Sequence, residues 1–168
     1  MSKKQLRLLA LILLLVLTTA CGKTGQIQDI SRVLGVDVSA GTLVTSADSH
    51  GGFHGDGRCF VELSFDAAST LDEALSIDRG WHPLPFTEPL HTVVYGDETP
   101  AATRGSLVTD GDGAPLFPTA DQGYFFFLDR HSQAGKTDTA LLNRASYNFT
   151  IALYDSGSQT LYYYELDT

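Results

Sequence analysis

The segment at residues 58–65 constrains the fold of this chain more than any other stretch. Apolar side chains occupy every second position from Cys59 to Phe65. A period of two is typical of a β-strand that turns one face toward a core. A second β-rich segment, residues 42–47, precedes it across a glycine-rich stretch. We therefore expect an antiparallel hairpin over residues 42–65, with an elaborate loop at its tip.

Three further segments in the last third of the chain predict strands. Residues 123–128 form an aromatic-rich run, and its continuity indicates burial on both faces and hence a central strand. Residues 146–154 and 160–166 follow as two more strands. The turn between them offers Gly157 for a positive φ, so we expect a second hairpin there.

The helical patterns are fewer and shorter. Residues 28–34 carry apolar side chains at helical spacing, residues 67–77 predict a second helix, and Thr87 can cap a third. Residues 99–122 hold much of the Pro, Gly and Asp and predict a long loop, with one strand at residues 106–108. The predicted fold class is α+β: an antiparallel sheet of about five strands with two or three short helices packed on one face.

The charge of the chain argues against two classes of partner. It carries 20 acidic and 11 basic residues, a net charge of −9, without a cluster of Lys or Arg in the domain. An acidic surface repels phosphate backbones, so we expect no nucleic acid partner. It also repels anionic lipid headgroups, so any attachment to a membrane has to be hydrophobic or covalent.

The first twenty residues predict an export signal. Three basic residues, Lys3, Lys4 and Arg7, precede an unbroken apolar run at positions 8–17. The run is shorter than the roughly 20 residues that span a bilayer, and its length and flanks are typical of a secretory signal peptide. We expect residues 1–20 to be the signal peptide, residues 21–27 a lipidated tether and residues 28–168 a single globular domain.

The residues at the end of this signal carry a resemblance. Leu17-Thr18-Thr19-Ala20-Cys21 is similar to the lipobox of bacterial lipoproteins, in which the cysteine thiol receives a diacylglyceryl group and becomes the mature N-terminus. The resemblance implies a lipid anchor on Cys21 and a location on the extracytoplasmic face of the cell membrane, since two buried acyl chains anchor a soluble domain stably. The alternative is a plain signal peptide with Cys21 as an ordinary thiol. The domain behind it resembles uncharacterised small lipoproteins and indicates no functional family.

Cysteine usage agrees with an acylated Cys21. The only other cysteine is Cys59, so acylation leaves no partner for an internal disulfide. Cys59 lies in the alternating segment, where a free thiol behaves as a small buried hydrophobe. We interpret Cys59 as structural.

The glycine-rich stretch at residues 50–57 is the strongest candidate for a polar site. It places His50, His54 and Asp56 among four glycines. His and Asp ligate zinc and other transition metals, and glycine lets a backbone bring such ligands together. No established zinc spacing is present, and the glycines also suit a loop that holds no ligand. The candidate polar or metal site comprises these three residues and His131, with the metal unspecified and no cofactor expected.

Three other features have both a functional and a structural interpretation. Asp129-Arg130-His131 indicates either an acid–base pair or a structural ion pair between Asp129 and Arg130. Trp81-His82-Pro83 with Phe86 indicates either an aromatic binding patch or part of the core. Asp110-Gly111-Asp112-Gly113 begins like a calcium loop but lacks its later ligands. We favour the structural interpretation of each.

Three hypotheses for function follow. The first is a non-enzymatic, membrane-anchored lipoprotein whose acidic domain binds a protein or small molecule outside the membrane. The second is a metal-binding protein or metal-dependent enzyme that uses the loop at residues 50–56. The third is an envelope-assembly or immunity-type inhibitor of a specific protein. No residue is assigned a catalytic role, and the absence of a Gly-x-Ser-x-Gly elbow weakens a serine hydrolase.

Overall fold

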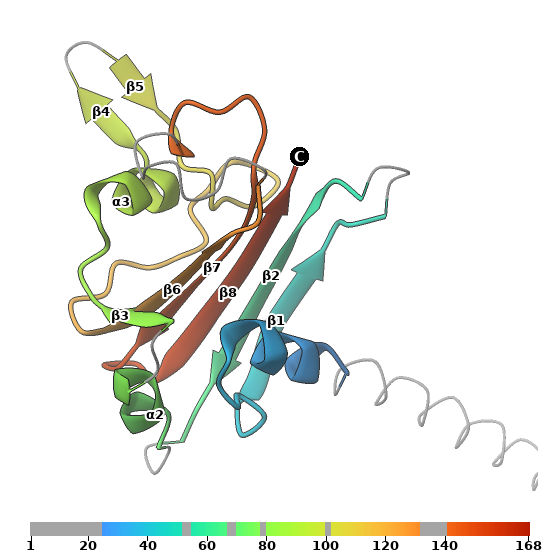
Figure 1. Ribbon diagram of the computed structural model, residues 1–168, viewed down its shortest axis with the longest axis vertical. Coiled ribbons are helices and arrows are strands. Elements are labelled where there is room, and N and C mark those ends of the chain that lie inside the picture. Colours follow the sequence, from blue (N-terminus) through green and yellow to red (C-terminus); the bar gives the residue numbers. More distant parts are fainter. Residues whose placement is uncertain (1–24, 52–54, 67–69, 78–79, 100–101, 132–140) are drawn as a thin grey trace, which may run out of the picture. The chain divides into compact units, whose positions relative to one another are not determined.

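A computed structural model describes residues 25–51, 55–66, 70–77, 80–99, 102–131 and 141–168. The chain divides into two compact units, residues 1–39 and residues 40–168. The second unit holds the strands that the structure describes and two labelled helices (Figure 1).

The first unit contains a helix at residues 25–34. Ser31 ties the following segment to this helix, because its hydroxyl donates to the Ile27 carbonyl at 2.9 Å and accepts a hydrogen bond from the Val38 backbone N–H at 3.1 Å. The helix predicted at residues 28–34 is present, and it begins about one turn earlier, at residue 25.

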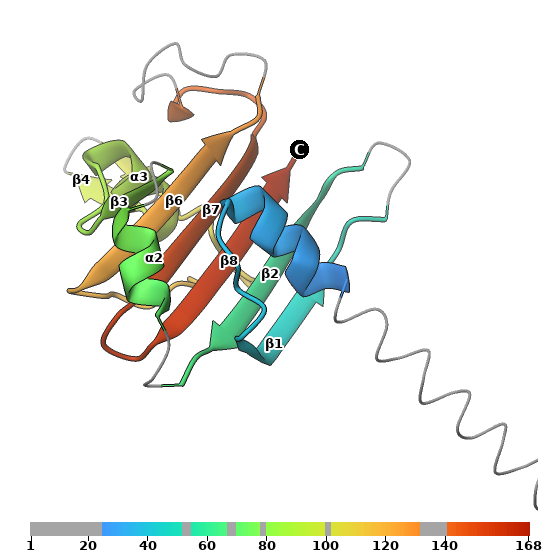
Figure 2. The same ribbon diagram turned by 60° about the horizontal axis from the view of Figure 1, so that its bottom comes forward.

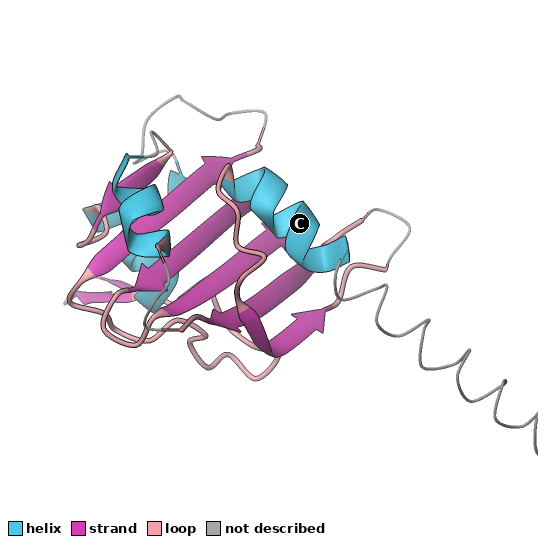
Figure 3. Ribbon diagram, turned by 90° about the horizontal axis from the view of Figure 1, so that it is seen from below, coloured by secondary structure: helices cyan, strands magenta, loops and turns pink. Residues whose placement is uncertain are grey.

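The second unit is built on a six-stranded sheet in which every neighbouring pair of strands is antiparallel (Figure 1, Figure 3). Across the sheet the strands are β1 (Thr42–Asp48), β2 (Gly57–Ser64), β8 (Thr160–Asp167), β7 (Asn148–Asp155), β6 (Gly123–Asp129) and β3 (Trp81–Pro83). The pair β1–β2 is the predicted hairpin. A separate small sheet pairs β4 (Asp97–Thr99) with β5 (Ala102–Arg104).

Helices α2 (Leu71–Ile77) and α3 (Glu88–Tyr95) lie on opposite faces of the six-stranded sheet (Figure 2). Helix α2 contacts β3 and β6. Helix α3 has a proline in its first turn, where a missing N–H costs no helical hydrogen bond. We call the two sides of the sheet the α2 face and the α3 face. The buried residues of the helices are Leu71 and Leu75 in α2, and Leu90, Thr92, Val93 and Val94 in α3.

The pleat of the strands decides which side chains reach each face. Residues paired across neighbouring strands share a face, and successive residues of one strand alternate between faces. Phe60, Tyr164 and Ile151 form one cross-strand row on the α3 face, and the next residue of β2, Val61, points to the α2 face. The core on the α3 face comprises Phe60, Phe86, Leu90, Val93, Val94, Val108, Phe117, Phe125, Leu141, Phe149, Ile151, Leu153, Tyr164 and Leu166.

The α+β class predicted from the sequence is confirmed. The main sheet has six strands rather than about five, because the short segment at residues 81–83 pairs with β6 as an edge strand. The two labelled helices cover both faces rather than one (Figure 2). The aromatic run is strand β6, and it lies next to the edge strand β3 rather than at the centre of the sheet.

Two local predictions differ from the structure, each for a reason in the hydrogen bonding. Residues 106–108 form no strand, since Ser106 Oγ donates to the Val94 carbonyl at 2.6 Å and accepts from the Val108 N–H at 3.0 Å. In the turn between β7 and β8 the positive φ falls on Gln159, at 52°, rather than on Gly157.

Cys59 is a buried thiol in β2 that forms no disulfide within the described residues. None of the helices that the structure describes has the length and apolar character needed to span a bilayer.

A nearly buried ion pair closes the end of β6. Arg144 donates two parallel hydrogen bonds to Asp129, from Nη1 to Oδ1 at 2.9 Å and from Nη2 to Oδ2 at 2.7 Å. The two side chains are 3% and 14% exposed. Burial works to raise the pKa of Asp129, but the bonds from Arg144 and from the His131 backbone N–H outweigh it, so that pKa is lowered. The pair therefore favours the charged carboxylate.

Replacing Asp129 by Asn is expected to lower the free energy of unfolding by about 3–5 kcal/mol, because the Arg144 charge is then buried without its partner. Because the folded-state pKa of Asp129 is lowered, its contribution is complete above the ordinary Asp value of about 3.9 and is lost as the pH falls through the folded-state value. Urea titrations should show a gap in the free energy of unfolding between wild type and variant that narrows as the pH falls below that ordinary value.

The control for this prediction is Asp29→Asn. Asp29 also pairs with an arginine, Arg32, but both side chains are more than half exposed, so the loss should stay below about 1 kcal/mol. A neutral-pH stability of Asp129→Asn equal to that of Asp29→Asn would contradict the role assigned to the buried pair.

Candidate functional site

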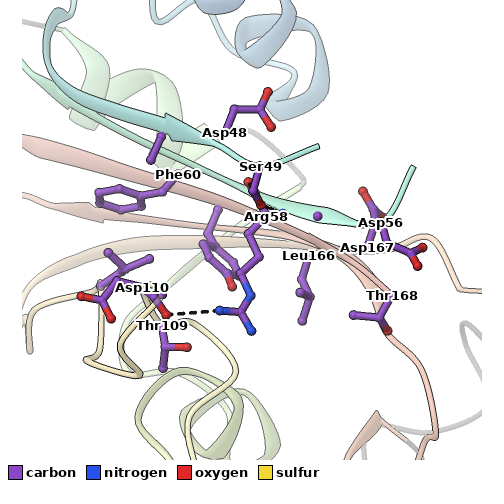
Figure 4. Close-up of a pocket in the computed structure, with 15 residues that line it drawn as sticks. Asp48, Ser49, Asp56, Arg58, Phe60, Thr109, Asp110, Leu166, Asp167 and Thr168 are labelled. Atoms are coloured by element: carbon purple, nitrogen blue, oxygen red, sulfur yellow. Dashed lines mark hydrogen bonds between the residues drawn. The ribbon is translucent and has the colours of Figure 1, made fainter. Parts of the chain in front are cut away.

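A pocket of about 640 Å³ opens at the end of the sheet where β2 begins and β8 ends (Figure 4). Strands β1, β2 and β8 form one side of it, and the loop at residues 109–116 forms the other. Its size falls within the range of about 300–1,000 Å³ that is usual for small-molecule sites. The side chains that define it are Ala47 from β1, Arg58 and Phe60 from β2, Tyr164 and Leu166 from β8, and Thr109 and Leu116 from the loop.

The floor of the pocket is apolar and is fixed by cross-strand pairing. Phe60 lies opposite Tyr164, and Arg58 lies opposite Leu166, so all four side chains belong to the α3 face. Phe60, Tyr164 and Leu166 are 9%, 0% and 4% exposed. The Tyr164 hydroxyl donates to the Leu107 carbonyl at 2.9 Å, and burial raises the pKa of this phenol. Tyr164 therefore stays neutral, with its oxygen already engaged.

Arg58 brings a positive charge to this apolar floor. Its side chain extends from the beginning of β2 into the cavity, and Nη1 donates to the Asp110 carbonyl at 3.2 Å (Figure 4). Within the described residues, no carboxylate lies at ion-pair distance from this guanidinium. The backbone of Arg58 is held by the residue that follows β1, because the Arg58 N–H donates to the Ser49 hydroxyl at 2.9 Å. The strand thus fixes the base of the side chain and leaves its head accessible to a ligand.

The loop opposite Arg58 owes its shape to Asp110. Oδ1 of Asp110 accepts hydrogen bonds from the backbone N–H groups of Asp112 and Ala114, both at 2.9 Å. Gly113 follows at a φ of 86°, a conformation that glycine adopts without strain. Asp110 is the first residue of the segment that begins like a calcium loop. Its carboxylate accepts hydrogen bonds from the backbone of its own turn, which agrees with the structural interpretation of this segment. The turn presents the Asp110 carbonyl to Arg58.

A second polar group lies on the α2 face. Asp48 accepts a hydrogen bond from the His50 backbone N–H at 2.9 Å, which lowers the pKa of this carboxyl, and the His50 Nδ1 lies 2.8 Å from the same oxygen. The His50 Nε2 lies 3.2 Å from Asp167 Oδ2, and Arg130 donates to the other oxygen of Asp167 at 2.8 Å. Although Asp48 and Asp167 border the pocket, their carboxylates are engaged on the other face.

The structure describes three of the four residues predicted to form one polar or metal site. Asp56 borders the pocket, whereas His50 belongs to the group on the α2 face. His131 follows β6, where its Nε2 lies 3.2 Å from Ser146 Oγ. His54 lies outside the described residues. Among the residues that the structure describes, no three His, Cys, Asp or Glu side chains gather closely enough to hold a metal ion.

The prediction that Asp129 and Arg130 form an ion pair with each other is wrong. Neighbouring residues of an extended chain point to opposite sides, so these two side chains diverge. Asp129 binds Arg144, and Arg130 binds Asp167. Each charge is paired, as the structural interpretation requires, but across strands rather than along one.

The aromatic segment before α3 is mostly core, as favoured from the sequence. Trp81 is 5% exposed and packs on Phe126 with a ring-centroid distance of 5.7 Å. His82 and Pro83 border a smaller cavity of about 440 Å³, next to Phe125. The described lining of this second cavity contains no arginine or lysine, which distinguishes it from the pocket at Arg58.

Gly57 closes the loop between β1 and β2 beside the pocket. A Cβ at this position would lie 2.7 Å from the Cα and backbone N of His50, closer than side chains pack against a backbone. The Ser49 N–H donates to the Arg58 carbonyl at 2.9 Å just inside this contact. The two strands therefore approach each other here only because residue 57 has no side chain.

Arg58 is a site residue that the sequence motifs did not predict. The available signal was its position as a lone cation at the start of the alternating segment, two residues before Phe60 and therefore on the same face. The approach of Asp110 had no local signal, because it lies 52 positions away along the chain. Comparison of the chain with protein-family models, curated proteins and solved structures finds no match.

Asp110→Ala is expected to loosen the loop opposite Arg58, because the Asp112 and Ala114 N–H groups lose their acceptor. We expect the free energy of unfolding to fall by about 1–3 kcal/mol and hydrogen exchange at these two amides to accelerate. Asp112→Ala is the matched control, since the Asp112 carboxylate accepts no hydrogen bond from the described residues. Equal amide protection in the two variants, measured by exchange mass spectrometry, would count against the role of Asp110.

Proposed function

We propose that this chain is an extracytoplasmic lipoprotein, anchored through Cys21, whose domain binds a small molecule in the pocket beside Arg58. The observation that carries the binding function is the pocket of about 640 Å³ with a buried apolar floor and an arginine head inside it (Figure 4). Small-molecule sites have this composition, in which apolar lining supplies affinity and a few polar groups set the orientation of the ligand.

The chemistry of the lining favours binding over nucleophilic catalysis. Among the described residues of the pocket there is no histidine, cysteine or lysine. A hydroxyl nucleophile needs a base beside it. Among the described residues the Ser49 hydroxyl bonds to none of the pocket carboxylates: it accepts the Arg58 N–H and lies 3.2 Å from the Arg58 carbonyl. The polar groups of the pocket are therefore suited to hold a ligand rather than to cleave one.

The anchored location rests on the first 21 residues. The basic start, the apolar run and the segment ending at Cys21 together resemble a lipoprotein signal. The whole sequence carries a net charge of −9, so electrostatic attraction to an anionic membrane is not expected, and acyl chains on Cys21 would supply the attachment. A domain held this way meets its ligand outside the cytoplasmic membrane.

Ala47→Trp is expected to obstruct the pocket. Ala47 is exposed and lies opposite Phe60 on the α3 face, so an indole at this position covers the apolar floor without entering the core. A neutral apolar probe, N-phenyl-1-naphthylamine, should bind the full-length variant at least about tenfold more weakly than wild type in fluorescence titrations. Thr45→Trp is the control, because Thr45 lies on the same face of β1 but outside the pocket lining. Similar probe affinity in both variants would contradict binding at this site.

Cys21→Ser is expected to release the protein from the membrane fraction, because the acyl chains lose their attachment point. Cys59→Ala should leave the protein in the membrane, since Cys59 is a buried residue of the sheet. Carbonate-washed membranes and mass spectrometry of the N-terminal peptide measure both effects. Membrane retention of Cys21→Ser at the wild-type level would refute lipidation at this residue.

A further inference from the structure

Arg58 enters the pocket with a charge that no neighbouring carboxylate neutralises among the described residues. One of its N–H groups donates to the Asp110 carbonyl at 3.2 Å. A guanidinium carries several N–H donors in a planar fork, so others remain for a ligand. The carbonyl of Asp110 holds the head in place without cancelling its charge.

The acidic residues around the pocket do not compete for this charge. Asp48 and Asp167 bind partners on the α2 face, and Figure 4 shows the Asp48 carboxylate directed away from Arg58. Asp110 turns its carboxylate into its own loop. Asp56 is exposed at the rim. An anion that reaches Arg58 therefore meets a cation rather than a ring of carboxylates.

Apolar side chains line the same pocket as the guanidinium. Leu166 is the cross-strand partner of Arg58, and Phe60 follows two residues later in β2. Leu116 adds an apolar surface from the loop. A ligand whose head reaches Arg58 places its body on these three side chains. Because the body then covers apolar surface, hydrocarbon is favoured over polar groups there.

We infer that the pocket takes an amphiphile with a single carboxylate, whose head binds Arg58 and whose hydrocarbon body lies on Phe60, Leu116 and Leu166. This inference deepens the proposed function and rests on it. A carboxylate matches the guanidinium fork through two parallel hydrogen bonds. One arginine balances one negative charge, whereas a phosphate dianion would keep an excess charge beside Asp56 in a protein of net charge −9. Medium-chain fatty acids and arylalkanoic acids share this chemistry.

Calorimetric titration of the full-length protein with matched ligands tests the inference. Octanoate and 3-phenylpropanoate represent the two sources of carboxylate, and octanol and 3-phenylpropanol are their neutral counterparts. Each acid that fits should bind about tenfold to a hundredfold more tightly than its alcohol, because the alcohol lacks the charge-assisted hydrogen bonds. For the titration, lipidated protein is inserted into phosphatidylcholine nanodiscs. Protein-free nanodiscs serve as the blank for ligand that partitions into the lipid.

Arg58→Gln should abolish the preference for the acid, and Arg58→Lys, which keeps the charge but loses the fork, should retain part of it. Arg104→Gln is the matched control. The Arg104 guanidinium also donates to a loop carbonyl, that of Leu142 at 2.6 Å, but it does not border the pocket. Circular dichroism confirms that each variant is folded.

The outcomes separate the inference from the proposed function. Equal affinity for acid and alcohol, or loss of the preference in Arg104→Gln as well, overturns the inference while small-molecule binding stands. Tighter binding of octyl phosphate or of octylammonium than of octanoate overturns the carboxylate assignment in the same way. Failure of every ligand to bind, the neutral ones included, overturns both the inference and the proposed binding function.

Discussion

The register between β2 and β8 is the constraint on which the rest of the second unit depends. The two strands pair without a shift from Gly57 opposite Asp167 to Ser64 opposite Thr160. Because side chains alternate along each strand, a slip of one residue would exchange the two faces of the sheet. The apolar floor of the pocket and the charged group behind it are therefore both consequences of one set of backbone hydrogen bonds.

This alternation also sorts the charges of an acidic protein. Arg58 points to the α3 face, whereas Asp167 in the neighbouring strand β8 belongs to the α2 face, where it binds Arg130 and lies 3.2 Å from His50 Nε2. The sheet thus separates a cation from carboxylates on the neighbouring strands. Without this separation the Arg58 charge would be neutralised within the protein, and the pocket would present only apolar surface to a ligand.

Local patterns predicted the elements of the fold, and long-range contacts determined what the sequence did not reveal. The strand at residues 42–47 follows from its β-rich composition and that at residues 58–65 from a period of two, which also places Arg58 on the same face as Phe60. His50 lies on the α2 face, where its backbone N–H donates to Asp48 and its Nε2 lies 3.2 Å from Asp167 Oδ2, and no spacing of His and Asp in the sequence encodes these contacts. The loop at residues 109–116 packs against β2 through contacts between residues far apart in the sequence, and these leave no local sequence pattern. Sequence patterns therefore could not predict the side of the pocket that this loop forms.

Gly57, at the loop end of the β1–β2 hairpin, limits which substitutions the pocket can accept. A side chain at residue 57 would displace His50 and, with it, the contacts of Asp48 and Asp167 on the far face. By contrast, Ala47 is exposed where β1 borders the pocket, and a Cβ at Gly111 would meet no atom within 4 Å. Substitutions at these two positions can therefore change the shape of the cavity and its choice of ligand, whereas the close contact with His50 restricts residue 57 to glycine.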